Sequence, residues 1–158
     1  MLNSFSLTRR EEIIIDQEID DVWNLLLQPD VWVRHTPYLR AITLLREDHW
    51  QWEIADISWP GGNLVAVMTE KLRPTSPRCL TFTHQPGDRP EMAGADGRFD
   101  LLPVQEGRST LLDFTMTVTA RLPLPRAGSS VVKAAMDPVV AKMLRSFVRG
   151  LVTEVEHR

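Results

Sequence analysis

The stretch of sequence that decides the fold runs from Ile19 to Ile42 and reads IDDVWNLLLQPDVWVRHTPYLRAI. Its first part, Val22–Leu27, carries enough apolar side chains for a helix of about two turns. The acids before it suit a helix N-terminus, and Asp20 is the expected cap. Pro29 ends this helix, because a proline pushes the residue before it out of the helical region.

A second short helix or turn is predicted over Asp30–His35, where Pro37 stops it. Before the two helices, residues 4–15 form an expected first strand that ends in three β-branched isoleucines. After Pro37 the pattern alternates with a period of two, and turn-forming residues separate the runs. The six later strands are expected at Leu39–Arg46, Trp50–Ile57, Leu64–Leu72, Arg78–Thr83, Arg98–Pro103 and Thr110–Leu122.

The last part of the chain returns to helical spacing. Its apolar face is marked by residues four and three apart: Met136, Val140, Met143, Phe147 and Leu151. Asp137 and Pro138 fit an N-cap followed by proline at the first helical position. The helix therefore either begins there or is kinked there, after a separate turn over Ser130–Ala135.

This order of elements predicts one α+β domain that spans residues 1–158. The connections between strands are too short for a crossover helix, so neighbouring strands should pair antiparallel. The two short helices can form a V that supports one end of a curved seven-stranded sheet, with the long C-terminal helix over its concave face. A length of 158 residues with 43% hydrophobic and 25% charged residues suits a single globular domain.

Composition excludes several classes of protein. The formal net charge of -3 gives no basic field for nucleic acid, so none is expected as a partner. Cys79 is the single cysteine, which excludes an intrachain disulfide. No apolar run is long enough for a signal peptide or a membrane span, and we expect a cytoplasmic protein.

A basic stripe on the expected final helix consists of Lys142, Arg145 and Arg149. Such stripes are usually solvated faces, but this one also suits transient contact with anionic lipid headgroups at a membrane surface. The sequence carries no signal for an oligomeric state.

The segment DDVWNLLLQPDVWVRHTPYLRAI resembles the START/Bet v 1-like (SRPBCC) superfamily. There a polar start and a Val-Trp helix lead to a Pro/Asp break, a Trp and a Pro before the second strand. The element order is similar to the helix-grip fold over nearly the whole chain, and the chain looks most like the bacterial polyketide-cyclase/dehydrase and coenzyme-Q-binding branch. The resemblance implies a cavity between sheet and C-terminal helix for a lipid, sterol, quinone, polyketide or hormone. It carries over no catalytic residue, and Pro138 departs from an uninterrupted final helix.

Alternation along the strands assigns the side chains that should face the helix. The fourth strand, LVAVMTEKL, shows no clear polarity. The other inward faces and the apolar helix face equally suit a filled core. The expected ligand-binding residues are Tyr38, Trp50, Trp52, Ile54, Trp59, Leu80, Phe82, His84, Phe99, Leu101, Phe114, Met116, Val118, Met136, Val140, Met143 and Phe147.

Because successive strands of an antiparallel meander alternate in direction, the strand order also predicts which connections lie at the same end of the sheet. The expected rim consists of His35 and Tyr38, Trp59 and Pro60, the loop 84–97 and the loop 123–130. Aromatic, proline and imidazole groups at such a rim suit the mouth of a cavity.

Asp56 and His84 are the candidates for acid–base chemistry. Both should face inward near the mouth, on strands two positions apart and so roughly 10 Å from each other. Histidine titrates near working pH, although an inward Asp and His at strand ends more often have structural roles.

Metal and nucleotide sites are not expected. His35, His49 and His157 have no spacing typical of metal ligands. The motifs GxSxG, GxxxxGK[ST] and GxGxxG are missing, which removes the simplest hydrolase and nucleotide hypotheses. No cofactor is expected.

Three functional hypotheses follow. The first is a binding or carrier protein for a hydrophobic small molecule, which we favour over an enzyme. The second is a cyclase/dehydratase-type enzyme in which His84 and Asp56 position and protonate the ligand. The third is a protein–protein interaction module with a closed cavity.

Overall fold

The computed structural model describes residues 2–59 and 62–157, and the side chain of Trp59 lies outside the described part. In this part of the chain, seven antiparallel strands form one sheet in the order β1-β7-β6-β5-β4-β3-β2. The elements are β1 (Asn3–Ile15), α1 (Ile19–Leu26), α2 (Pro29–His35), β2 (Leu39–Arg46), β3 (His49–Trp59), β4 (Gly62–Thr75), β5 (Cys79–His84), β6 (Ala93–Val104), β7 (Ser109–Leu122), the 3-10 turn η1 (Arg126–Gly128) and α3 (Ser129–Glu156).

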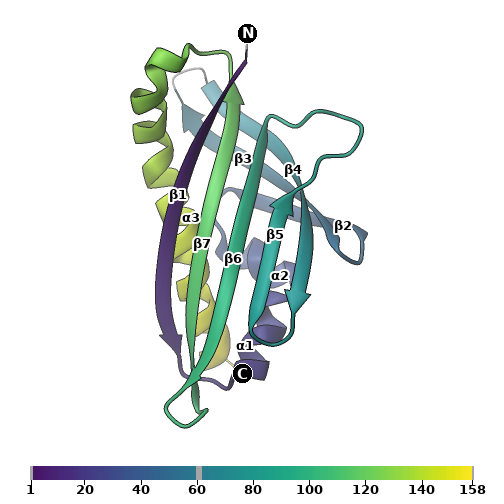
Figure 1. The fold of residues 1–158 in the computed structure, drawn as a ribbon, viewed down its shortest axis with the longest axis vertical. Coiled ribbons are helices and arrows are strands. Elements are labelled where there is room, and N and C mark those ends of the chain that lie inside the picture. The colour runs from purple at the N-terminus through teal and green to yellow at the C-terminus, as the bar shows by residue number, and fades with distance from the viewer. Residues whose placement is uncertain (1, 60–61, 158) are drawn as a thin grey trace.

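The curved sheet wraps around α3, which runs along its concave side (Figure 1). Helices α1 and α2 lie at the end of the sheet opposite the β7–α3 connection (Figure 1). The predicted α+β helix-grip architecture is confirmed, including the pair of short helices after the first strand.

The strand β6 begins at Ala93, well before the expected start at Arg98. Its first residues, AGADG, have low strand propensity, which hid them from the sequence pattern. They are held in the sheet by β7, with Ala93 opposite Ala120 and Gly97 opposite Met116. A long partner strand therefore overrides the local preference of this segment.

Helix α3 is continuous from Ser129 to Glu156 and contains Pro138. The turn expected over Ser130–Ala135 is helical, and Asp137 is not an N-cap. Its carboxylate instead lies 3.1 Å from the guanidinium of Arg9 on β1. Pro138 removes one main-chain hydrogen bond. The helix nevertheless continues through this position, where it contacts β1 through the Arg9–Asp137 ion pair.

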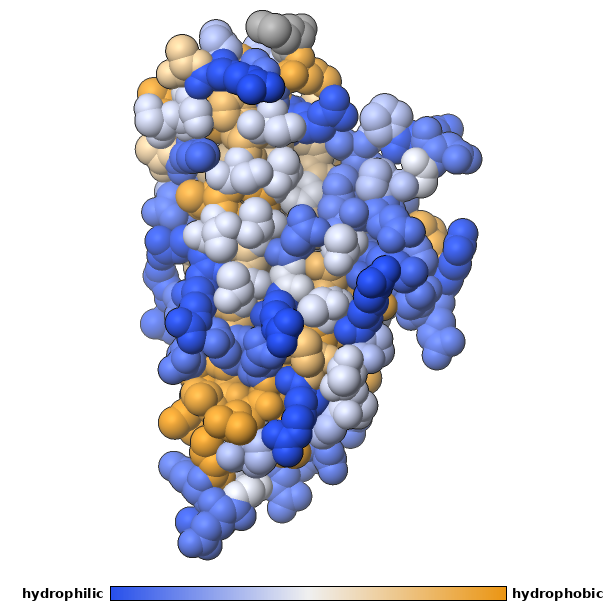
Figure 2. Space-filling view, in the orientation of Figure 1, coloured by the Kyte–Doolittle hydropathy of each residue, from blue (hydrophilic) through white to orange (hydrophobic). Residues whose placement is uncertain are grey.

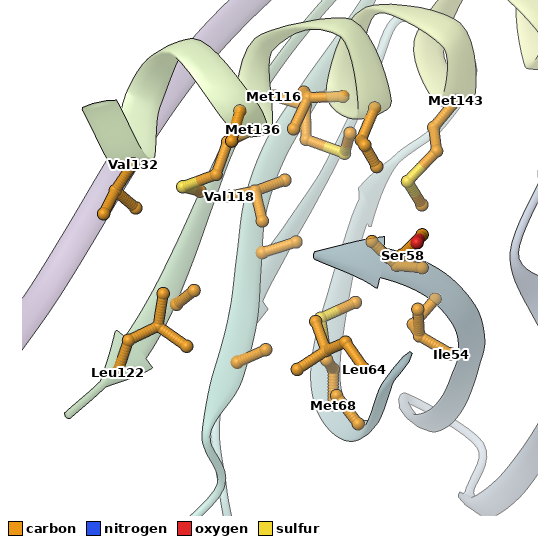
Figure 3. A pocket seen from close by; sticks show the side chains of 18 of the residues that line it. Ile54, Ser58, Leu64, Met68, Met116, Val118, Leu122, Val132, Met136 and Met143 are labelled. Carbon is orange, nitrogen blue, oxygen red and sulfur yellow. The ribbon is translucent and has the colours of Figure 1, made fainter. Parts of the chain in front are cut away.

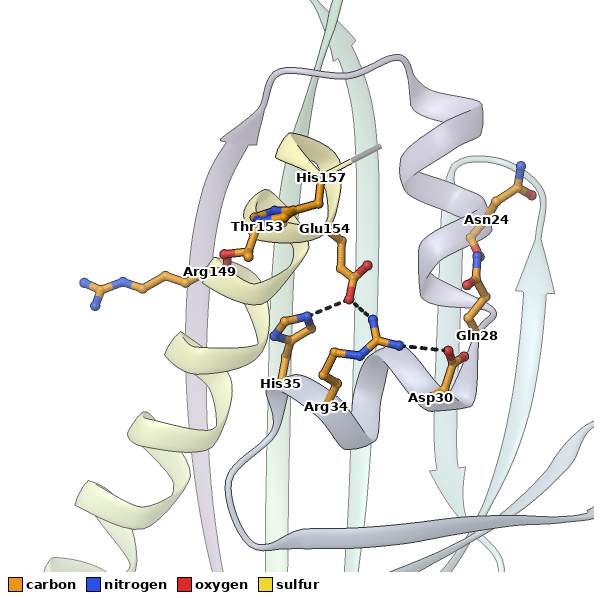
Figure 4. Close-up of polar contacts among 9 residues, drawn as sticks. All are labelled: Asn24, Gln28, Asp30, Arg34, His35, Arg149, Thr153, Glu154 and His157. Atoms are coloured by element: carbon orange, nitrogen blue, oxygen red, sulfur yellow. Dashed lines mark hydrogen bonds and ion pairs between the residues drawn. The ribbon is translucent and has the colours of Figure 1, made fainter.

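Helix α2 docks on the C-terminal half of α3 (Figure 4). His35 Nε2 lies 2.8 Å from Glu154 Oε1, and Arg34 forms an ion pair with the same carboxylate. The hydrogen bond to His35, together with Arg34, lowers the pKa of Glu154. Gly150 makes the close approach possible, since a Cβ there would lie 2.2 Å from His35 Cγ.

Helix α2 contributes the buried side chain of Trp32 to the core. The Trp32 indole nitrogen donates a hydrogen bond to the carbonyl of Leu26, 2.9 Å away. Its ring lies 4.4 Å from that of Phe147 on α3, centroid to centroid. We call the buried rings around it the aromatic cluster: Trp32, Trp50, Trp52, Phe82, Phe99, Phe114 and Phe147.

The outer face of the sheet is mostly polar (Figure 2). On β1 and β7 it carries cross-strand contacts such as Thr8 with Thr117, 2.6 Å between hydroxyl oxygens. An apolar patch interrupts it near the α1 end of the sheet, where Ile14 and Leu102 are both exposed. The polar outer face identifies the concave side as the place for a buried site.

Candidate functional site

A pocket with a volume of about 430 Å³ lies between the concave face of the sheet and the N-terminal half of α3. Side chains from β3, β4, β7 and α3 point into it from several sides (Figure 3). Its described wall consists of Trp52, Ile54, Ile57, Ser58, Leu64, Ala66, Met68, Ala93, Ala95, Met116, Val118, Ala120, Leu122, Leu124, Val131, Val132, Ala135, Met136, Val139, Val140 and Met143.

The pocket exists because side-chain size changes along each strand. On β6 the inward positions are Ala93 and Ala95 at the pocket, and Phe99 deeper in the core. On β7 the change is from Met116 at the pocket to Phe114 in the aromatic cluster. The concave side is thus divided into a filled aromatic half and a half that small and aliphatic side chains leave open.

Several of the predicted binding residues reach the pocket wall, and their role as ligand contacts remains a prediction. Those that line it are Trp52, Ile54, Met116, Val118, Met136, Val140 and Met143. Other residues predicted to bind the ligand instead fill the core, as the filled-core alternative expected. Those buried in the hydrophobic core outside the described pocket wall are Trp50, Leu80, Phe82, Phe99, Leu101, Phe114 and Phe147.

Tyr38 and Trp59 were also predicted as binding residues. Tyr38 is outside the described pocket wall, and Lys142 Nζ sits 5.6 Å from the centre of its ring. The prediction for Trp59 concerns a side chain outside the described part of the structure.

Asp56 points away from the pocket, contrary to the expectation. The register between β3 and β4 shifts between Ile54 and Ile57, and Asp56 adopts a positive φ of 65°. This β-bulge breaks the alternation, so that Ile57 and Ser58 face the pocket. The Asp56 side chain is 65% exposed and pairs with Arg40.

His84 is also not a pocket residue. Its ring lies over Gly94, where a Cβ would be 2.2 Å from His84 Cγ. Gly94 is flanked by Ala93 and Ala95, which line the pocket, so its own Cβ position faces the opposite side of β6. There His84 Nε2 lies 2.8 Å from Glu91 Oε1. The expectation that Asp56 and His84 face each other across the cavity is therefore wrong.

The predicted rim is only partly assembled. The β5–β6 loop and the β7–α3 connection lie at the same end of the sheet (Figure 1). His35 instead contacts Glu154 near the C-terminal end of α3 (Figure 4), which lies at the end of the molecule opposite the β7–α3 connection (Figure 1). The up-and-down order of the strands gave the wrong end for His35, because β2 begins opposite Ile54, in the middle of β3, and not at the end of that strand. Pro60 lies outside the described residues.

Glu70 is the residue that the sequence analysis missed. It is fully buried on the inward face of β4, and its Oε1 accepts a hydrogen bond from the Ala95 main-chain nitrogen at 2.9 Å. Its Oε2 has no hydrogen-bond partner within the described residues. Burial raises the pKa of Glu70 to about 9, so the carboxyl is protonated at neutral pH. The spacing of Ala66, Met68 and Leu72 on the same face was the available signal.

The position of Glu70 follows from the shortness of β5, which ends at His84. Beyond that point β4 and β6 lack a strand between them. Glu70 bridges the two strands from the inside through Ala95. On the outside, Glu91 accepts hydrogen bonds from the Thr69 main-chain nitrogen at 2.7 Å and its hydroxyl at 2.6 Å. Carboxyl groups therefore replace the missing main-chain partners.

The described residues include no group of three or more His, Cys, Asp or Glu side chains able to hold a metal ion. The same part of the chain has no helix of sufficient length and apolarity to cross a membrane.

Comparison with known proteins bears on the fold. No protein-family model and no curated protein sequence matches the chain. Among solved structures, the Zhui aromatase/cyclase from a Streptomyces species is similar at a TM-score of 0.71 and 13% identity, over 97% of this chain and 95% of its own. A START superfamily protein from Mycobacterium smegmatis is similar at 0.68 and 16% identity, over 95% and 97% of the two chains.

A conserved protein from Geobacillus kaustophilus gives a TM-score of 0.70 at 17% identity, over 96% of each chain. The chain has the START-type helix-grip fold. The resemblance read from the sequence is confirmed at the level of fold, and the neighbours include an aromatase/cyclase. On the gripped helix of this START-type fold, Lys142, Arg145 and Arg149 are all exposed.

Proposed function

We propose that this protein binds a hydrophobic small molecule in the pocket between the sheet and α3. The observation that carries the proposal is the pocket wall, in which Ser58 is the one polar residue among those described. A volume of about 430 Å³ is within the range of small-molecule sites. Burial of the ligand would supply the driving force, about 25 cal/mol per Å² of apolar surface removed from water.

The structural neighbours support a small-molecule role, since one is an aromatase/cyclase and another a START superfamily protein. Lipids, quinones, sterols and polyketide-like molecules all have the required apolar surface. We favour binding or transport over catalysis, because Asp56 and His84 lie outside the described pocket wall. The open pocket also weighs against an interaction module with a closed cavity.

The first experiment is native mass spectrometry of the purified protein, followed by solvent extraction and identification of any released compound. A titration with the dye anilinonaphthalene sulfonate accompanies it. We expect one apolar molecule per chain, or dye binding to an empty pocket that fatty acids, quinones or sterols compete for. A clean apo mass with no response to dye or competitors would contradict the proposal.

A matched pair of variants locates the site. Ala66 lines the pocket, whereas its neighbour Val65 is 67% exposed and points to the other face of β4. Ala66→Phe should fill the cavity and weaken dye binding about tenfold or more, because the added ring occupies the ligand's volume. Val65→Phe should leave binding unchanged. Equal effects from both variants would place the dye outside the pocket.

A further inference from the structure

The pocket and the aromatic cluster meet at a boundary that carries two polar groups. On β4 the inward positions Ala66 and Met68 line the pocket, and the next inward position is Glu70. On β3, Trp52 lines the pocket while its ring also packs against Trp32 of the aromatic cluster, 5.2 Å between centroids. Trp52 therefore belongs to the inner end of the pocket wall, and Glu70 lies one inward position beyond Met68, outside the described wall.

The two side chains are neighbours across the sheet. Met68 pairs with Trp52 and Glu70 pairs with Trp50, so Glu70 and Trp52 are diagonal on one face of adjacent strands. Diagonal Cβ atoms lie roughly 7–8 Å apart, which long side chains can span to reach one atom between them. Glu70 is also next to the pocket wall through its hydrogen bond to Ala95 and through Met68, whose flexible side chain adapts to a neighbour.

Both groups have an unused hydrogen-bonding atom. Trp52 Nε1 and Glu70 Oε2 are buried and have no partner within the described residues. The indole N–H can only donate. In the protonated carboxyl, Oε1 accepts from the Ala95 nitrogen, which leaves Oε2–H as a donor. Buried donors without acceptors are costly, so this arrangement needs an explanation.

We infer that a ligand which displaces the flexible Met68 side chain places a carbonyl oxygen at the inner end of the pocket, where it accepts hydrogen bonds from Trp52 Nε1–H and Glu70 Oε2–H. This inference rests on the proposed function and narrows it to neutral apolar ketones, quinones and esters. A carbonyl oxygen has two lone pairs and no hydrogen of its own. A ligand hydroxyl would bring a donor to a place that already has two, and a carboxylate would lose its hydration in an apolar wall.

The test compares two probes of nearly equal shape, acetylnaphthalene and ethylnaphthalene substituted at the same ring position. Affinities are measured by competition with anilinonaphthalene sulfonate, and the ratio of the two affinities is the readout. Trp52→Phe and Glu70→Leu should each lower the affinity for the ketone relative to the hydrocarbon about tenfold, because each removes one donor. Glu70→Gln keeps an N–H donor and should preserve the ratio.

Trp50→Phe is the control, because it makes the same chemical change one inward position away, outside the described pocket wall. It should leave the ratio unchanged. If both probes bind and the ratio is the same in the wild type and in every variant, the carbonyl site is refuted while the pocket stands. If neither probe nor the dye binds the wild-type protein, the proposed function itself fails.

Discussion

At the scale of single residues, Glu70 is the unusual group. It is a carboxylic acid with no exposed surface, and it lies at the point where β5 ends between β4 and β6. Its raised pKa comes first from desolvation, and the nearby carboxylates Glu91 and Asp96 raise it further. His84 is its cross-strand partner, but that ring is engaged with Glu91 on the outer side.

Glu70→Gln should change how stability depends on pH. The unfolded chain releases this proton near pH 4.5 and the folded protein near 9, so unfolding releases a proton between these values. Rising pH therefore favours unfolding of the wild type, by up to about 1.4 kcal/mol per pH unit from this group. The glutamine variant lacks this contribution.

Urea denaturation of both proteins at several values from roughly pH 5 to pH 8 measures the effect. The free energy of unfolding of the variant should rise relative to the wild type as pH increases. A difference that is constant with pH would mean that Glu70 is ionised in the folded protein.

The residue scale is also where sequence reasoning was weakest. Period-two alternation placed Ile54 and Met116 correctly at the pocket but failed for Asp56, because a bulge is a register change between strands and leaves no fixed mark in one strand. The inward orientation of Glu70 could be read from the alternation along its strand. The missing hydrogen-bond partner of its Oε2 could not, because that depends on where β5 ends.

At the scale of elements, the contact between α2 and α3 positions Trp32 in the core. Gly150 and His35 form this contact, and a Cβ at position 150 would overlap the His35 ring. The two helices were expected from Pro29 and Pro37, whereas their docking could not be read from the sequence. A glycine inside a helix gives no indication of which side chain needs its space.

A double-mutant cycle tests this contact. Gly150→Ala should destabilise the protein by about 1–3 kcal/mol, because the methyl group clashes with His35. In a His35→Ala background the same change should instead stabilise by about 0.5–1 kcal/mol, since alanine has the higher helix propensity. Thermal or urea denaturation of the four proteins gives the coupling. Additive effects would show that the two residues are not in contact.

At the scale of the whole molecule, the concave side has a filled half and an open half. Both lie under the same helix: Phe147 and Leu151 pack in the core, whereas Val132 and Met136 border the pocket. Element order and helix periodicity predicted the helix over the sheet. They could not predict the division, because it depends on which strand positions lie level with one another.

Amide hydrogen exchange should detect this division. Without ligand, amides in residues 131–139 of α3 should exchange faster than those in residues 143–151, because fewer packed side chains hold them. Saturation with anilinonaphthalene sulfonate should narrow the difference, since ligand binding suppresses openings that break the pocket. Ala66→Phe should narrow the same difference in exchange rate without ligand, because the added ring fills the pocket. Equal exchange in both halves of the free protein would contradict the division.

The division into two halves has a consequence for divergence of sequence. Substitutions at wall positions such as Ala93, Ala95 or Ala120 change the shape of the cavity without touching the packed rings around Trp32. Apart from Trp52, which belongs to both, the packed rings and the pocket wall consist of different residues of one small domain. Mutations can then accumulate in the wall while the fold is maintained, and new binding specificities become accessible through single substitutions.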